Sequence, residues 1–385
     1  MTPPSLARPL ALVLLPAALA AAPACATIPE PNGGGDNLPN AVAGPFRAIT
    51  ADELGNSRSA PDALEDTRSY ARDPSIIDAD GDLATPEVVG YFGAVISYGD
   101  ASAKPSDPTN VILRFGALDG RSFDRAAEKV LDAEAYWEGG VVGSPSAVRV
   151  RGEIFLYYAS VAAIGLAKSP DGHTFTRAPD PIFIPNPDLQ SWEKGAPPRS
   201  PGVVRLDDGS FRMFYQVALG PSTKATAIGE ASSPDGVAWT RVGSGPALAP
   251  SGPAALVGTT VTDAGADDPY DSSSVGSPYP IMATTAEGRR VLRVYYGAVD
   301  HQGTRTIGLA ARFGSDGPLQ RAASPVYGSG STLAPTEPCV LPFGAPASGV
   351  SLLYATQLAA LKSDHQAVVV GVAPGGAVLP PPNPL

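Results

Sequence analysis

One repeated pattern constrains the fold of this chain more than any other feature. In its clearest copy, residues 143–177, a Pro-led alternating segment (SPSAVRV), an Arg-Gly turn and an aromatic segment (EIFLYYAS) precede a shorter apolar segment (AAIGLAKS), an Asp-Gly turn and a final HTFTR. Pro can open a strand but cannot donate inside one. Asp-Gly favours a hairpin because both central residues of that turn need φ > 0. We therefore predict four short antiparallel strands in each copy.

The pattern recurs along the chain, closely at 199–241 and more loosely in the segments that begin TPEVVGY, SPYPIMA and EPCVLPF. Successive anchoring prolines are separated by 59, 56, 77 and 60 residues, and they are Pro86, Pro145, Pro201, Pro278 and Pro338. Four-stranded sheets at a near-constant period are typical of β-propellers. We predict an all-β fold, a five-bladed β-propeller over residues 45–385. The last copy lacks a fourth strand, so we expect an N-terminal strand near Phe46–Ile49 to complete that blade and close the ring.

Composition supports an all-β protein and limits its partners. The chain has 42 Gly, 42 Pro and 43% hydrophobic residues, enough for many turns and a sizeable core. Its net charge of −11 disfavours nucleic acid and anionic membranes as partners, since both need a basic face. We expect a monomer.

The N-terminus has the pattern of an export signal. Residues 10–22 form an apolar run too short to span a membrane, and we assign residues 1–24 to a signal peptide. The sequence Ala-Pro-Ala before Cys25 resembles a bacterial lipobox but also suits an ordinary signal peptidase. The protein is thus expected to be lipid-anchored to the cell envelope through Cys25, its only contact with a membrane, or secreted. Residues 25–44 are expected to form a flexible tether, and Cys339 to be a small buried hydrophobe.

The position of the loops predicts where a ligand binds. The connections between blades and the second-to-third-strand loops are long and lie on one face, near which Ser144, Ser200 and Ser277 precede their prolines. Binding residues concentrate on loops held by a rigid scaffold. We expect a site on this face near the axis, with these serines and Arg199 binding substrate. His301, in a second-to-third-strand loop, could bind a metal or a substrate hydroxyl.

A Trp-Glu pair recurs on the same face, at Trp137 and Trp192, eight or nine residues before an anchoring proline. An aromatic plane suits the C–H face of a sugar ring, so both could be sugar platforms. The interpretation that we favour is architectural, because repeated residues in repeat proteins usually hold neighbouring units together.

The pattern SP-x-V…G…YY…IG-x-A-x-SPDG-x-x-W-x-R, with WE before the next SP, resembles the arabinanase, levansucrase and invertase superfamily of five-bladed propellers and is similar to the related mannoside phosphorylases. The resemblance covers roughly residues 45–380. It implies a carbohydrate-active protein whose pocket lies at the axial end of the channel.

The family's three catalytic carboxylates do not transfer cleanly. The resemblance implies an Asp-Pro in the first blade, an Asp after the second-blade Pro and a Glu before the third-blade Pro, where this chain has TPE at 85–87, SPS at 144–146 and RSP at 199–201. Asp73-Pro74 would supply the first of these only if the first strand is misplaced. Other acids of the same face could supply the pair that a glycosidase needs: Glu87, Glu337, Asp267, Asp268, Asp271 and Asp300. Glu87 and Glu337 are expected to be the most axial, and we take these two and Asp271 as catalytic candidates.

An acidic segment could hold a cation. Asp78, Asp80 and Asp82 alternate around Gly81, with the oxygen density of a calcium site but without the spacing of an EF-hand. A plain acidic turn is the alternative interpretation. Two functions from different classes therefore remain open: an exported glycoside hydrolase-like enzyme, and a non-catalytic propeller that binds a glycan or another ligand.

Overall fold

The structure, a computed structural model, describes residues 43–49, 70–81, 85, 87–96, 109–121, 123, 127–220, 224–252, 269–285, 289–328, 334–342, 350–358 and 366–373. Within these ranges the strands form five four-stranded sheets in which all neighbours are antiparallel. The predicted all-β propeller with four-stranded antiparallel blades is confirmed. No helix of the described residues is long and apolar enough to cross a membrane. The signal peptide, most of the tether and Cys25 lie outside these ranges.

Each sheet is one blade, and the strands are numbered in chain order. Blade 1 has β2 (Tyr70–Asp78), β3 (Val88–Ile96), β4 (Thr109–Ala117) and β5 (Glu128–Asp132). Blade 2 has β6 (Gly143–Val150), β7 (Glu153–Ala159), β8 (Ile164–Ser169) and β9 (Thr176–Arg177), preceded by the 3-10 turn η2 (Tyr136–Glu138). Blade 3 has β10 (Arg199–Arg205), β11 (Phe211–Ala218), β12 (Thr226–Ser233) and β13 (Thr240–Arg241). Blade 4 has β14 (Ser274–Thr284), β15 (Arg290–Val299), β16 (Arg305–Phe313) and β17 (Gln320–Arg321). Blade 5 has β18 (Pro335–Pro342), β19 (Ser351–Leu358), β20 (Gln366–Ala373) and the N-terminal β1 (Arg47–Ala48).

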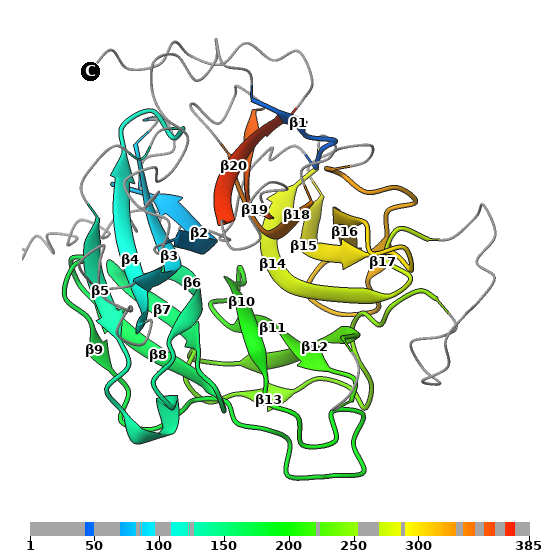
Figure 1. The fold of residues 1–385 in the computed structure, drawn as a ribbon, viewed down its shortest axis with the longest axis horizontal. Coiled ribbons are helices and arrows are strands. Elements are labelled where there is room, and N and C mark those ends of the chain that lie inside the picture. The colour runs from blue at the N-terminus through cyan, green and yellow to red at the C-terminus, as the bar shows by residue number, and fades with distance from the viewer. Residues whose placement is uncertain are drawn as a thin grey trace, which may run out of the picture.

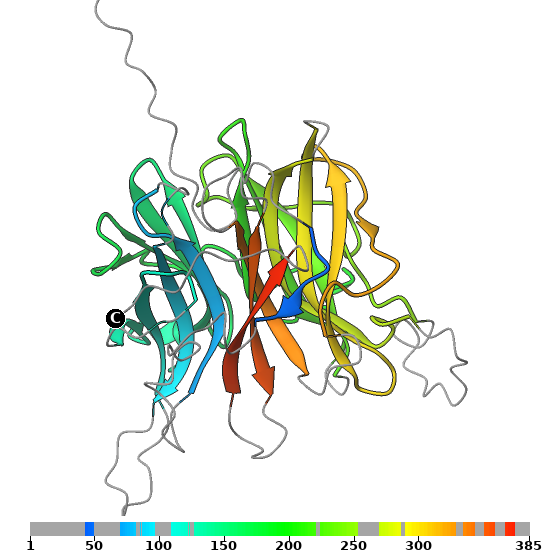
Figure 2. The same cartoon turned by 90° about the horizontal axis from the view of Figure 1, so that it is seen from above.

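The blades surround a common axis (Figure 1). The innermost strands β2, β6, β10, β14 and β18 contact one another in this order, and β18 contacts β2. Between the last and first blades, the Ile76 N–H donates to Cys339 Sγ at 3.2 Å, and Cys339 is buried as predicted. In the outermost position of blade 5, β1 pairs with β20 through Arg47–Val372 and Ala48–Gly371, within the predicted segment (Figure 2).

The sequence pattern explains the strands and their turns. β7 is aromatic and β-branched, and every residue after its first is buried because blades pack on both of its sides. The turn before it has Arg151 at φ 50° and Gly152 at φ 86°, the pair of positive values that a two-residue hairpin turn needs. These turns lie at the end of the ring opposite the beginnings of the innermost strands.

Tyrosines of the second strands join neighbouring blades at that end. Each hydroxyl donates to the carbonyl of the glycine in an Asp-Gly turn of the next blade: Tyr91 to Gly172 at 3.0 Å, Tyr157 to Gly236 at 2.9 Å and Tyr354 to Gly120 at 2.5 Å. The last of these bonds links blade 5 to blade 1.

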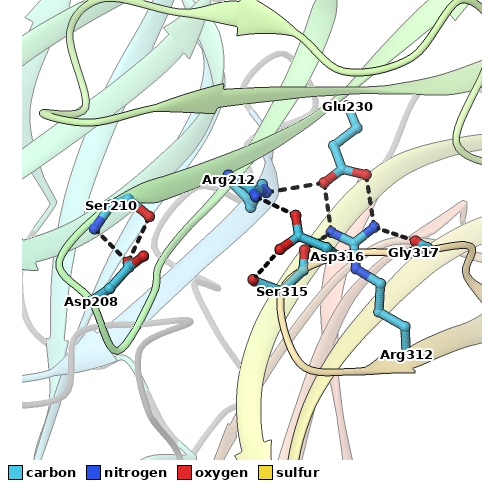
Figure 3. Close-up of polar contacts among 8 residues, drawn as sticks. All are labelled: Asp208, Ser210, Arg212, Glu230, Arg312, Ser315, Asp316 and Gly317. Carbon is cyan, nitrogen blue, oxygen red and sulfur yellow. Dashed lines mark hydrogen bonds and ion pairs between the residues drawn. The ribbon is translucent and has the colours of Figure 1, made fainter.

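A buried ion pair joins blades 3 and 4 (Figure 3). Arg312 of β16 donates two hydrogen bonds to Glu230 of β12, at 2.6 and 2.9 Å, and both side chains are less than 10% exposed. Arg212 Nε lies 3.3 Å from the same carboxylate and its Nη2 donates to the exposed Asp316 at 2.8 Å. Such a pair is costly to break because the remaining charge is left buried.

The first blade corrects one prediction. Its innermost strand is β2, which contains Asp73-Pro74, whereas the segment after Pro86 forms β3, the second strand. Glu87 therefore follows the β2–β3 turn, where its carbonyl accepts the Ala79 N–H at 3.0 Å. The prediction of an axial Glu87 is wrong, because this turn lies at the opposite end of the ring from the start of β2.

Candidate functional site

The residue before the proline occupies an unusual backbone conformation in all five innermost strands. Asp73, Ser144, Ser200, Ser277 and Glu337 have φ between 44° and 54°, and the pairing with the second strand shifts register at each of these points. The five residues line, with their prolines and Tyr279, a narrow axial space of about 30 Å³. We call them the pre-proline ring.

The conformation of the pre-proline ring is strained. A left-handed φ in a residue other than glycine costs of the order of 1–3 kcal/mol, and a following proline further restricts the backbone towards extended values. Five repetitions of this cost at one place are tolerated because the surrounding ladder fixes the backbone. Strain of this kind concentrates at functional sites, so the ring is a candidate functional site.

The two acids of the ring lie in contact at the junction of blades 1 and 5. The Asp73 N–H donates to Glu337 Oε2 at 3.1 Å and to Thr356 Oγ1 at 3.0 Å. Burial, together with the charge of Asp73 and hydrogen bonding to it, raises the pKa of Glu337 from 4.5 to about 8. Near neutral pH the pair therefore holds a proton on Glu337.

A chain of hydrogen bonds continues from Asp73 around the ring. Asp73 Oδ2 accepts from the backbone N–H of Ser144 at 3.2 Å and from its hydroxyl at 3.1 Å. The Ser200 hydroxyl lies 3.5 Å from that of Ser144. The amide oxygen of Gln216 accepts the Ser277 N–H at 2.9 Å. The contacts thus connect four residues of the ring, Glu337, Asp73, Ser144 and Ser200, while Gln216 holds Ser277 separately.

A cavity of about 580 Å³ opens above the ring, on the face where the innermost strands begin. This is the volume of a small-molecule or sugar site. We call it the axial pocket. Its described lining contains acids, cations, hydroxyls and small residues and no aromatic side chain, and it consists of Arg72, Asp73, Val141, Gly143, Ser144, Ala159, Ser160, Arg199, Ser200, Gln216, Lys224, Thr226, Ser273, Ser274, Gly276, Ser277, Gly297, Val299, Asp300, His301, Gly303, Arg305, Thr336 and Glu337.

Two glycines let side chains approach closely here. A Cβ on Gly93 would lie 3.0 Å from Asp73 Oδ2, and one on Gly276 would lie 2.3 Å from Gln216 Oε1. The positions of the Asp73 carboxylate and of the Gln216 amide, which holds Ser277, therefore each require a glycine as neighbour.

The axial pocket brings together several of the predicted site residues: Ser144, Arg199, Ser200, Ser277, Asp300, His301 and Glu337. It excludes others. Glu87 is exposed at the opposite end of the ring, and Asp267 and Asp268 lie outside the described residues. Asp271 is buried, its Oδ2 accepting the Tyr296 hydroxyl at 2.9 Å, and it does not line the pocket.

Asp271 belongs to a repeated clamp that also explains the Trp-Glu pairs. In blades 2, 3 and 4 a buried acid before the innermost strand accepts a second-strand tyrosine hydroxyl and lies within 3.5 Å of a fourth-strand arginine: Glu138 with Tyr158 and Arg177, Glu193 with Tyr215 and Arg241, and Asp271 with Tyr296 and Arg321. Burial and the adjacent acid raise the pKa of all three tyrosines.

The aromatic residues before these acids pack with the blades. Trp137 stacks on Tyr158 with ring centroids 6.1 Å apart, and Trp192 packs against the core between blades 2 and 3. Neither lines the axial pocket. Their arrangement agrees with the architectural interpretation, and as placed they offer no sugar platform to the pocket.

The acidic segment lies at the opposite end of the ring, after β2. Asp78 is buried and accepts the Gly81 N–H, and its pKa rises to about 6 because burial disfavours its charge. Asp80 accepts the Thr85 hydroxyl at 3.3 Å, and Asp82 lies outside the described residues. No cluster of three or more potential metal ligands occurs in the part of the chain that the structure describes.

Sequence reasoning named Asp73 only as an alternative, on the condition that the first strand was misplaced, and it missed five further lining residues: Arg72, Gln216, Lys224, Thr226 and Arg305. Asp73 could have been found by aligning its Asp-Pro with the Ser-Pro of the next three blades. Of the others, Thr226 and Arg305 begin strands, Arg72 and Gln216 lie within strands and Lys224 precedes one, and no local motif distinguishes them.

Comparisons with known proteins identify the fold. No protein-family description and no curated protein sequence matches the chain. Solved structures do match. A glycosyl hydrolase from Bacteroides ovatus has a TM-score of 0.57 at 15% identity, with 92% of this chain and 100% of that chain covered.

Two further matches concern mannosides. A structure described under the GH130 family of mannoside phosphorylases, which contains glycoside hydrolases that target β-1,2 mannosidic linkages in Candida mannan, has a TM-score of 0.56 at 14% identity and covers 91% of this chain and 99% of that chain. The β-1,2-mannobiose phosphorylase from Listeria innocua has a TM-score of 0.55 at 12% identity, with 85% and 96% covered. The chain has the propeller fold of glycoside hydrolases and mannoside phosphorylases, as its sequence resemblance implied.

Proposed function

We propose that this protein binds a glycan in the axial pocket. The observation that carries the proposal is the pocket of about 580 Å³ above the strained pre-proline ring. Sugars present many hydroxyls, and the hydroxyl, amide and charged groups of this lining offer donors and acceptors for them. The fold shared with glycoside hydrolases and mannoside phosphorylases supports the same class of ligand.

Glycoside cleavage is the second candidate, and the Asp73–Glu337 pair favours it. Glu337 keeps a proton near neutral pH, as a general acid must, and Asp73 stands in the Asp-Pro where the resemblance places a base. However, glycosidases hold their two carboxyl groups about 5–9.5 Å apart so that the sugar fits between them. Here a hydrogen bond joins the side chains of Asp73 and Glu337, which leaves no room for a sugar between the two carboxyl groups, so binding stands first.

A glycan array and a hydrolysis and phosphorolysis screen on the mature domain test both candidates. The array includes β-1,2-mannosides because the structural neighbours act on them. The variants are Asp73→Asn and Glu337→Gln, with Glu87→Gln, exposed at the opposite end, as the matched control.

Binding without turnover by the wild type supports the first candidate. Turnover that is lost in either ring variant and kept in Glu87→Gln replaces it with the second. A wild type that binds no glycan contradicts the proposal.

We also propose that the protein is exported and carries a lipid on Cys25, with the propeller acting as a monomer outside the cytoplasm. The apolar run at 10–22 and the lipobox-like residues before Cys25 support export and the lipid anchor. Mass spectrometry of the mature N-terminus, with Cys25→Ser beside it, tests it. An unmodified N-terminus that begins elsewhere contradicts the anchor, and a cytoplasmic full-length chain contradicts export.

A further inference from the structure

The axial pocket concentrates positive charge in a protein that is acidic overall. Four cationic side chains line it, Arg72, Arg199, Lys224 and Arg305, in a chain of net charge −11. Arg72 Nε lies 3.4 Å from Asp73 Oδ2, so this cation is balanced by an acid. The other three are the subject of the inference.

Arg199, Lys224 and Arg305 make no side-chain hydrogen bond or ion pair in the described part of the chain. Arg199 begins β10, Lys224 precedes β12 and Arg305 begins β16, so all three belong to blades 3 and 4. A lone exposed lysine or arginine is ordinary. Arg199 and Lys224 are exposed and Arg305 is half-buried, but all three line one concave site. The half-buried Arg177 and Arg241, by contrast, are paired with acids.

Three acids also belong to the described lining of the pocket. Asp73 and Glu337 come from blades 1 and 5, whereas Asp300 lies in the β15–β16 loop of blade 4, where it accepts the Thr304 N–H. Blade 3 adjoins neither blade 1 nor blade 5, and blade 4 adjoins blade 5 (Figure 1). Among the described residues, the wall formed by blades 3 and 4 therefore carries three unpaired cations against the single carboxylate of Asp300. An excess of one sign of charge attracts ligands of the opposite sign.

The lining also argues against a neutral sugar as the preferred ligand. The rings of Phe, Tyr and Trp offer apolar planes for the C–H faces of neutral sugars, and the described lining of this pocket contains none of these residues. Arginine forks bind carboxylates through two parallel hydrogen bonds, and a lysine adds a point charge. Binding energy here must come from charge and hydrogen bonds.

We propose that the ligand of the axial pocket is an acidic glycan, in which a carboxylate-bearing uronosyl unit is held by Arg199, Lys224 and Arg305. This inference rests on the proposed glycan-binding function and names its ligand class. The carboxylate faces blades 3 and 4, and the hydroxyls of the sugar face the ring serines and the Asp73–Glu337 pair.

Calorimetric titration of the mature domain tests the proposal. The probes are an oligogalacturonate and a glucuronic acid-containing oligosaccharide, the same two oligosaccharides after reduction of their carboxyl groups, and inorganic phosphate alone. The variants are the double substitution Arg199→Gln with Arg305→Gln, and the charge-preserving Arg199→Lys with Arg305→Lys. The matched control is Arg151→Gln, in the exposed β6–β7 turn at the opposite end.

We expect an acidic probe to bind at least about tenfold more tightly than its reduced form, and this preference to weaken as salt is raised. The Gln double variant should lose the preference, the Lys double variant should keep part of it, and Arg151→Gln should keep all of it. Thermal unfolding of each variant verifies that it is folded. If the Gln double variant is unfolded, the partial loss of preference expected for the Lys double variant is the test.

Three results would overturn the proposal. Equal affinity for acidic and reduced glycans would overturn the proposed preference for acidic glycans but would leave the proposed glycan-binding function standing. Phosphate alone binding as tightly as the uronosides, and competing with them, would make the cations a phosphate site. Failure of all glycans, including the neutral ones of the array, would overturn the proposed function along with the inference.

Discussion

The backbone N–H of Asp73 donates to Glu337 Oε2 at 3.1 Å and so joins the first and last blades at the floor of the axial pocket. The two residues are 264 positions apart in the chain. Both occupy left-handed backbone before a proline, and together they hold a proton that an isolated glutamate would have lost. The contact that joins the first and last blades is therefore also the one that keeps Glu337 protonated.

This contact predicts a pH dependence of stability. The pKa of Glu337 is raised in the folded state from 4.5 to about 8, so the folded protein binds the proton more tightly than the unfolded chain. The stabilisation is full below about pH 4.5 and is lost as the pH rises to about 8. Glu337→Gln removes this loss: we expect the variant to match the wild type near pH 4.5 and to exceed it by about 1–3 kcal/mol near pH 8.5. Urea unfolding across this range measures it.

The comparison with Gln isolates Glu337 from the buried Asp78, whose pKa also rises, to about 6. A difference between wild type and variant that does not change with pH would contradict the shared proton.

The strain in the pre-proline ring predicts an inverted order of substitutions at Ser200. Both Ser200→Gly and Ser200→Ala remove the hydroxyl, but only glycine adopts φ near 44° without cost. We expect Ser200→Gly to be more stable than Ser200→Ala by about 1 kcal/mol in chemical denaturation. The control is Ser232 of β12, which pairs with strands on both sides and where alanine should be the more stable of the two. Alanine as the more stable residue at Ser200, as at Ser232, would show that the ring is unstrained.

The buried ion pair between blades 3 and 4 predicts a large loss of stability. Glu230→Gln leaves Arg312 buried without a counter-charge (Figure 3), which should cost about 3 kcal/mol. Asp316→Asn, which removes an exposed partner of Arg212, should cost less than about 1 kcal/mol. Equal effects in thermal unfolding would mean that burial does not determine the strength of this network.

The repeated acid–tyrosine–arginine clamp predicts a structural role for the Trp-Glu pairs. Glu138 accepts the Tyr158 hydroxyl at 2.7 Å and the N–H groups of Glu134 and Ala135 at 2.7 and 2.8 Å. Glu138→Gln turns an acceptor into a donor there and should cost about 2–4 kcal/mol. Glycan affinity, measured on the folded variant, should be unchanged. A loss of glycan affinity with unchanged stability would show that this motif contributes to binding.

The N-terminal strand predicts how the ring is held together. Phe46 is buried, lies edge-on to Tyr295 and donates its N–H to the Val326 carbonyl at 2.8 Å. We propose that β1 closes the ring, and expect Phe46→Ala to cost about 3–5 kcal/mol. A truncation that begins at residue 50 should unfold at a lower temperature than one that begins at residue 43. Equal midpoints would show that β1 does not contribute to closure.

Much of the architecture could be predicted from the sequence because the propeller is built from local hairpins. The Pro-led strands and Asp-Gly turns of blades 2 and 3 are short-range patterns, and they mark the strands where the structure has them. Blade 1 was misassigned because its innermost strand carries Arg72-Asp73 before the proline in place of the small residues of blades 2 and 4. Charged residues of the site thus replace the small residues by which the strand pattern is recognised in the other blades.

The pocket itself was only partly predictable. The ring serines and Glu337 share a sequence position relative to their prolines, and that relation identified them. Lys224 and Arg305 lie at strand ends in different hairpins, and only closure of the ring brings them together. Asp271, one of the clamp acids, was taken as a catalytic candidate because its tyrosine and arginine partners are distant in sequence.

The most direct test of the central claim is a crystal structure of the mature domain with a glycan that it binds. We predict sugar density in the axial pocket, in contact with the ring serines and with Arg199 or Arg305. Sugar bound at any other surface, with the axial pocket occupied by solvent, would contradict the account.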